Sequence, residues 1–210
     1  MRIEPGHPSQ LVAGAARALV AAATAGARAA RIVRGLAVAP RFGARGTNFV
    51  FDPAGTYTFA SIFVGNNVNL GVRPTLMATR SQIRIGNNVV FGPGVTVRGG
   101  NHRFDVVGEF IVNVTDAMKR DSDDRGVHIE DDVWVGGGAT ILHGVTIGRG
   151  SVIGAAAVVS RSVPPYSVVV GNPGVVVRAR FSRAEALAHE SALYAVAERL
   201  DADALRHLHD

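Results

Sequence analysis

The hydrophobic positions of residues 129–163 recur every six residues. Reading in steps of six from Ile129, each position holds a β-branched aliphatic residue, and the position four further on is small or aliphatic. A helical face repeats about every 3.6 residues and a half-buried strand every two, so neither element explains this period. The leading positions are Ile129, Val135, Ile141, Ile147, Ile153 and Val159, and the second set is Val133, Ala139, Val145, Ser151, Ala157 and Val163.

Shorter runs with the same period occur earlier in the chain. Short strands joined by equal corners produce it, because each leading residue points inward and stacks on its neighbours. We therefore predict a mainly β protein, a parallel β-helix of hexapeptide type over residues 58–178. The period is lost for 26 residues after His102, which predicts an excursion loop over 103–128. The earlier runs are Ile85, Phe91 and Val97, and Val64, Leu70 and Leu76.

The flanking segments have other compositions. Residues 9–35 are rich in alanine and arginine and predict a helix, and the prolines and glycines of 36–57 predict an irregular connector, so 1–57 forms an N-terminal segment. Residues 179–210 predict a C-terminal helical segment, since "SRAE" at 182–185 has the form of a capping box. Leu187, Tyr194, Leu200, Leu205 and Leu208 supply its apolar positions, and we expect two short helices with a break near Asp201.

The amino-acid composition limits which reactions, partners and locations are compatible with this chain. The chain has no cysteine, which excludes thiol nucleophiles and disulfides and is compatible with the cytoplasmic location that we expect. The net charge of +5 comes partly from N-terminal arginines, and we expect no nucleic-acid partner. The apolar segment 11–27 is interrupted by Arg17 and is weak as a membrane span, and we expect no signal peptide. For the basic helix we favour packing or an oligomer contact over peripheral membrane binding.

The stretch "VWVGGGATILHGVTIGRGSVIGAAAVVSRSVPPYSVVVGNPGVVVR" (133–178) resembles the hexapeptide-repeat acyltransferases. It is most similar to the galactoside, maltose and polysaccharide O-acetyltransferases, because it joins the repeat to "W-V-G", "V-P-P" and "G-N-P" at fixed positions. The resemblance implies a left-handed parallel β-helix, a homotrimer, and acetyl-CoA as the acyl donor. It implies an acetyl-CoA-dependent O-acetyltransferase that modifies a sugar or glycan hydroxyl.

The resemblance gives His102, in "GGNHRFD", a role as general base. In this family a histidine just before a loop excursion takes the proton of the acceptor hydroxyl, and an imidazole is suited to that task near neutral pH. Asn101 stands where an aspartate sometimes precedes the histidine, and is expected to hold the acceptor. Asp105 and Glu109 are near enough in sequence to orient the imidazole. A solvated turn histidine is the alternative.

The resemblance also assigns the donor site. Gly137 and Ala155 correspond to small residues whose backbone meets the pantetheine arm. Ser160 and Arg161 align with the Thr-Lys pair at the pyrophosphate and adenosine end, where arginine keeps the charge and adds a fork suited to phosphate. Arg178 aligns with the basic residue near the 3′-phosphate.

Other interpretations remain open. Trp134 takes the family's tryptophan position and is expected at the subunit seam, next to the substrate. At the donor site the structural alternatives are that Gly137 and Ala155 are small because the corners are tight, and that Arg161 and Arg178 are solvated. His128 and His143 are expected to be solvated, and the spacing of His102, His128 and His143 offers no close pair for zinc, so we expect no metal. The rival functions are an N-acetyltransferase for an amino-sugar nucleotide and a non-catalytic β-helix scaffold.

Overall fold

The computed structural model describes residues 10–209, which form two compact units that divide between Pro40 and Arg41. The first unit contains helix α1 (Gln10–Val38), which covers most of the helical segment expected at 9–35; Ser9 lies outside the described residues. Half of the helix is alanine or arginine and none of it is acidic, and both alanine and arginine favour helix. No helix within 10–209 is both long enough and apolar enough to cross a membrane.

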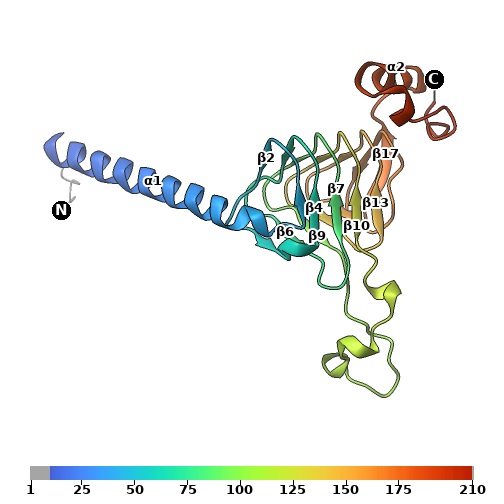
Figure 1. The fold of residues 1–210 in the computed structure, drawn as a ribbon, viewed down its shortest axis with the longest axis horizontal. Helices are drawn as coiled ribbons and strands as arrows, with labels where there is room; N and C mark the ends of the chain where they lie inside the picture. The colour runs from blue at the N-terminus through green and yellow to red at the C-terminus, as the bar shows by residue number, and fades with distance from the viewer. Residues whose placement is uncertain (1–9, 210) are drawn as a thin grey trace, which may run out of the picture. The chain divides into compact units, whose positions relative to one another are not determined.

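The second unit is a parallel β-solenoid of three sheets (Figure 1). The chain visits sheets A, B and C in turn, so strands pair in parallel with their equivalents one coil away, except for the last strand, which is antiparallel to the strand before it. Sheet A comprises β1 (Ala44–Arg45), β4 (Ile62–Val64), β7 (Ile83–Ile85), β10 (Val127–Ile129) and β13 (Val145–Ile147). Sheet B comprises β2 (Phe49–Val50), β5 (Val68–Asn69), β8 (Val90–Phe91), β11 (Trp134–Val135), β14 (Val152–Ile153), β16 (Ser167–Val170) and β17 (Val175–Ala179). Sheet C comprises β3 (Thr56–Tyr57), β6 (Thr75–Met77), β9 (Thr96–Arg98), β12 (Thr140–Ile141) and β15 (Val158–Val159).

The six-residue period marks the inward positions, as predicted. All six leading residues from Ile129 to Val159 are at most 1% exposed, and their partners four residues on are at most 6% exposed. The register keeps equivalent residues in line, with Ile141 paired to Val97 on one side and to Val159 on the other. Stacked aliphatic residues therefore fill the interior from coil to coil.

The corner between sheets A and B is built by a ladder of asparagines. Asn48, Asn67 and Asn88 all have φ between 50° and 56°, which asparagine tolerates better than most residues. The Asn48 amide donates to Asn67 Oδ1 at 2.6 Å, and the Asn67 amide donates to Asn88 Oδ1 at 2.8 Å. Each corner therefore supports the next one through a side-chain hydrogen bond.

The expectation of an irregular connector over 36–57 is wrong for most of its length. Strands β1, β2 and β3 pair in parallel with β4, β5 and β6, so the first coil begins at Ala44. Phe42 is 6% exposed and contacts four aromatic rings edge-on at 5.0–5.6 Å, namely those of Phe49, Phe51, Tyr57 and Phe59. Aromatic side chains cover the open end of the stack here, and they replace the aliphatic period that the prediction relied on.

Helix α2 (Arg183–Leu193) packs against the corner between sheets A and B of the last coils, through Arg149 and Tyr166. Ser182 and Glu185 form the expected capping box. The carboxylate of Glu190, 1% exposed, accepts from the Tyr166 hydroxyl at 2.6 Å and from Arg149 at 2.8 Å. Burial, and then the hydrogen bond to Glu190, raise the pKa of Tyr166. The second short helix expected after Asp201 is replaced by turns, although Leu205 and Leu208 are buried as their spacing indicated.

The excursion loop leaves the stack after Gly99 and returns at Gly126, where β10 resumes its register with β7 (Figure 1, yellow-green). It contains three short 3-10 turns, Ile111–Asn113, Asp116–Met118 and Asp121–Asp123. Asp124, with a side chain 7% exposed, holds the loop's Lys119 at 2.6 Å and Arg80 of the preceding coil at 3.4 Å. This carboxylate therefore ties the loop to the β-helix.

The stacked core makes a specific stability prediction. Ile141→Ala should lower the free energy of unfolding by about 2–5 kcal/mol, because it leaves a cavity among residues that are almost fully buried. Thr140→Ala, at a half-buried position of the same strand, should cost much less. Urea unfolding of the two variants checks this, and equal losses would contradict the inward assignment.

The ion pairs of Asp124, which tie the excursion loop to the β-helix, make a second prediction. Asp124→Asn keeps the size of the side chain but removes its charge, so amide exchange in residues 103–126 should quicken while exchange in the β-helix is unchanged. Asp121→Asn is the matched control, since Asp121 is exposed and lies outside this ion-pair network. Unchanged exchange in Asp124→Asn would show that the loop is held by other contacts.

Candidate active site

A cavity of about 510 Å³ lies at the corner that follows sheet C. It is bounded by residues that end or follow β6, β9 and β12, and by six residues of the excursion loop, three of which (Gly100, Asn101 and His102) stand at its start. Consecutive coils therefore contribute one wall and the loop contributes the other. The side chains used below are Arg80, Arg98, Asn101, His102, Lys119, Asp124 and His143.

His102 and Asn101 reach the cavity from the end of β9. The Asn101 backbone N–H donates to the Asp123 carbonyl at 2.8 Å, which joins the start of the loop to its end. The His102 backbone N–H donates to Asn101 Oδ1 at 3.0 Å, so the asparagine side chain turns back onto the histidine's own backbone. His102 is exposed, and its ring has no hydrogen-bond partner among residues 10–209, which leaves both nitrogens available to a ligand.

His143 lines the same cavity, and here the expectation of a solvated ring was wrong. It follows β12 just as His102 follows β9, one coil earlier. The residue is half-buried, and its Nδ1 is buried without a hydrogen-bond partner among the described residues. A buried polar atom without a partner is costly. Ile141 pairs with Val97 in adjacent strands, so the segments that follow these two strands, which contain His143 and His102, share one corner.

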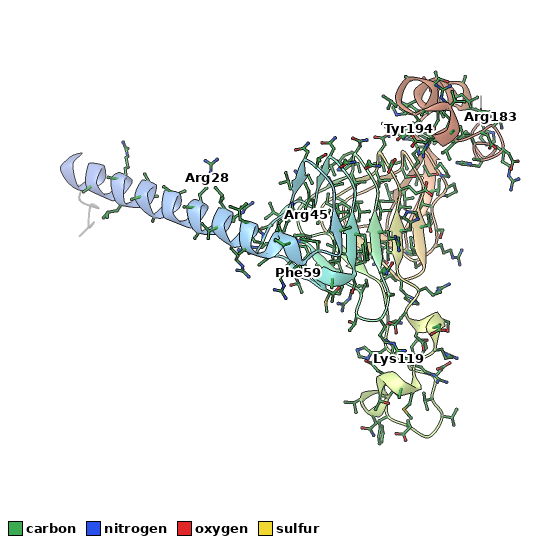
Figure 2. The ribbon with its side chains drawn as sticks, viewed as in Figure 1. Arg28, Arg45, Phe59, Lys119, Arg183 and Tyr194 are labelled. Atoms are coloured by element: carbon green, nitrogen blue, oxygen red, sulfur yellow. The ribbon has the colours of Figure 1, made fainter. Side chains whose placement is uncertain are left out.

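The fixed charges around the cavity are partly neutralised. Lys119, labelled in Figure 2, and Arg80 are both paired to Asp124. Arg98 is exposed, and one of its terminal nitrogens lies 2.9 Å from the Met77 sulfur. Within the described residues Arg98 has no acidic partner, so the cavity keeps one unpaired guanidinium near His102.

Asp105 does not orient His102 in this structure. Its carboxylate accepts from Arg103 Nε at 2.9 Å and from Arg120 at 2.7 Å. These two hydrogen bonds, that from Arg103 first, lower the pKa of Asp105. No residue within 10–209 takes the part of orienting the His102 imidazole.

The residues expected to hold the pantetheine arm lie on another corner. Gly137 and Ala155 follow β11 and β14, between sheets B and C, where the Ala156 N–H donates to the Gly137 carbonyl at 2.9 Å. A Cβ on Gly136 would lie 2.5 Å from the Ala155 backbone nitrogen, so the coils approach closely and only small residues fit. Gly137 precedes β12 and His143 follows it, so this corner and the cavity lie at opposite ends of the strand.

The charged donor residues are divided between two places. Ser160 and Arg161 follow β15, on the same corner as His102 and His143, and both are exposed. Arg178 lies on β17 opposite Val168, exposed, with one nitrogen donating to the Ala179 carbonyl at 3.0 Å. A single chain therefore brings Ser160 and Arg161 to the histidine corner but leaves Arg178, Gly137 and Ala155 elsewhere.

Trp134 stands on the outer face of sheet B. It is 54% exposed, and its register partner Val90 is 45% exposed. Its side chain does not line the cavity at His102 within one chain. The three histidines considered for a metal also separate, because His128 points outward from sheet A; no cluster of three His, Asp or Glu residues with metal-binding geometry occurs in 10–209.

Comparison with known proteins agrees with this architecture. The model of the bacterial transferase hexapeptide (six repeats) matches residues 126–161. A galactoside O-acetyltransferase of Lactococcus lactis is 34% identical over 126 residues, which cover 57% of this chain and 56% of that protein. The chain spans about half the length of the curated relatives it matches.

Two solved structures extend the match. A hexapeptide-repeat acetyltransferase of Vibrio cholerae, solved with acetyl coenzyme A, has a TM-score of 0.59 and 29% identity over 68% of this chain and 74% of its own. A maltose O-acetyltransferase of Clostridium difficile has a TM-score of 0.50 and 30% identity over 69% of this chain and 73% of its own. The repeat, the solenoid and these relatives show that the chain belongs to the hexapeptide-repeat acetyltransferase family.

Proposed function

We propose that the protein transfers an acetyl group from acetyl-CoA to a hydroxyl of a sugar or glycan. The observation that carries the proposal is the exposed His102, which lines the 510 Å³ cavity with Asn101 and His143. The Vibrio cholerae relative, solved with acetyl coenzyme A, supports the donor. The galactoside and maltose acetyltransferases support a sugar acceptor.

The chemistry needs a base, because a sugar hydroxyl is a weak nucleophile near neutral pH. His102 takes the hydroxyl proton while the oxygen attacks the thioester carbonyl, and a new C–O bond forms. The C–S bond then breaks, and the imidazolium returns the proton to the leaving thiolate. The acetyl group passes directly to the acceptor, which suits a chain without cysteine.

In this proposal, backbone atoms and arginine side chains bind the acetyl-CoA donor. Gly137 and Ala155 expose backbone on a corner that lacks large side chains, so the pantetheine arm can lie against the coils. Arg161 and Arg178 then meet the phosphates, for which a planar guanidinium offers charge-assisted hydrogen bonds. Ser160 adds a hydroxyl beside Arg161.

Two chains are needed to complete such a site, and we infer a homotrimer. The arm-binding corner and the His102 corner lie at opposite ends of sheet C, so the thioester at one chain's Gly137 corner would face another chain's histidine. Exposed apolar side chains could be buried in contacts between subunits. On sheet B these are Trp134 and Val90. On the excursion loop four such side chains are 70–100% exposed, namely Phe104, Val107, Phe110 and Val112. The predicted mass is about 66 kDa, three times the 21.9 kDa of one chain.

The first test removes the base. His102→Ala should lower acetyl transfer by roughly 10²–10⁴-fold, the usual contribution of a general base, with little change in coenzyme A affinity. Turnover is measured with hydroxyl sugars and, in parallel, with amino sugars, which separates O- from N-acetylation.

The control is His209→Ala, an exposed histidine outside the β-helix, which should keep normal turnover. Near-normal activity in His102→Ala would remove this residue from the mechanism. If the wild-type protein binds coenzyme A but acetylates only amines, the acceptor group is an amine and the proposed hydroxyl acceptor is wrong.

The second test asks whether subunits share the site. Ala155→Trp should block the donor corner, and His102→Ala removes the base, so each pure variant is inactive. Mixed trimers contain some sites with an intact corner from one chain and an intact His102 from another. Refolding an equimolar mixture should therefore regain a measurable part of wild-type activity. Sedimentation that shows an active monomer, or mixtures as inactive as their parents, would contradict the shared site.

A further inference from the structure

A second pocket, of about 440 Å³, lies on the outer face of sheet A. The polar side chains that line it are Ser81, Gln82, Arg84, Arg125, His128 and Thr146. Two are guanidinium groups, and no acidic side chain of the described residues lines the pocket. It therefore differs from the His102 cavity, whose cations Arg80 and Lys119 are paired to Asp124.

Strand register brings this set together. β7 and β10 alternate buried, exposed, buried, so Arg84 and His128 point outward while their neighbours fill the core. Arg84 pairs with His128, and His128 pairs with Thr146, in adjacent parallel strands. Because neighbouring strands lie about 4.8 Å apart, the three side chains form one short row.

Arg84 is held in place without being neutralised. One terminal nitrogen donates to Gln82 Oε1 at 2.6 Å, and the guanidinium carbon lies 5.0 Å from the centre of the Phe63 ring. Neither contact supplies negative charge to balance the arginine. The guanidinium is thereby oriented in advance and still carries its full charge.

Arg125 is placed by the absence of a side chain at Gly144. A Cβ there would lie 2.5 Å from the Arg125 guanidinium carbon, and Gly144 has a φ of +75°, which favours glycine. The Gly144 N–H donates to the Gly126 carbonyl at 2.6 Å and so fixes the residue that follows Arg125. Arg125 has no acidic partner within residues 10–209.

We propose that this pocket binds an oxyanion, a phosphate or carboxylate group, between Arg84 and Arg125. Two guanidiniums without a carboxylate form a site that charge-assisted hydrogen bonds can fill. The hydroxyl of Thr146 adds a donor, whereas that of Ser81 donates to the Gly99 carbonyl at 2.8 Å. The pocket adjoins the candidate active site, since His143 lines one and Gly144 the other. The anion therefore belongs either to the donor's phosphates or to an acidic group on the acceptor.

The direct test uses inorganic phosphate and the full chain. Phosphate titrated against the wild type should bind saturably, as followed by calorimetry and by the His128 imidazole resonances. Arg84→Gln and Arg125→Gln should each weaken binding by about tenfold, one charge-assisted hydrogen bond. Arg45→Gln, an exposed arginine on β1, is the matched control and should bind as the wild type.

This binding assay does not depend on acetyl transfer, so it stands or fails separately from the proposed function. No saturable binding, or equal affinity in all three variants, would overturn the site. Subunit dissociation in the Arg84→Gln, Arg125→Gln double variant without phosphate would also overturn it, because the pocket would then be a subunit contact.

Kinetics on the same variants identify the source of the anion. A rise in KM for acetyl-CoA, with the acceptor KM unchanged, assigns the pocket to the donor's phosphates. A rise in KM for glucuronate and not for glucose assigns it to an acidic acceptor. Either result supports the oxyanion site.

Discussion

No coil of this protein can bury its own inner face, and the rest of the structure follows from that constraint. A coil of three two- or three-residue strands has one inward aliphatic residue at each leading position, and only the coils above and below remove it from water. Ile141 is covered because Val97 and Val159 lie in register with it. The register must therefore persist along the stack, and equivalent corner residues come to lie one above another.

Stacked corners explain where the candidate site residues lie. Outward-facing strand residues and corner residues are free to vary, while the inward positions are not. The corner after sheet C uses this freedom for His102, His143, Ser160 and Arg161 on successive coils. The excursion loop is inserted at the same corner without loss of core, because Val127 returns to register with Ile83. A long insertion at a corner interrupts no strand pair.

The sequence predicts the fold where packing is periodic and fails where it is not. The aliphatic period identified the inward residues of the regular coils, but it could not detect the first coil, whose interior contacts are made by the rings of Phe42, Phe49 and Tyr57. The resemblance drew attention to His102, whereas His143 was missed because a solvated corner residue and a cavity wall have the same local sequence. Their difference depends on the excursion loop, which Asp124 ties to Arg80 of the preceding coil and whose sequence has no repeat.

The two cavities beside this corner differ in charge, and that difference bears on what the protein binds. In the His102 cavity, the single carboxylate of Asp124 is paired to both Arg80 and Lys119 and so offsets part of their positive charge. In the pocket on sheet A, Gly144 leaves room for the Arg125 guanidinium against the backbone, and no acidic side chain of the described residues lines that pocket. The His102 cavity would suit a neutral hydroxyl, and the pocket on sheet A would suit an anionic group. The two groups could belong to one ligand or to two ligands bound side by side. The fold brings the two surfaces together because both adjoin the same stacked coils, with His143 lining one and its neighbour Gly144 lining the other.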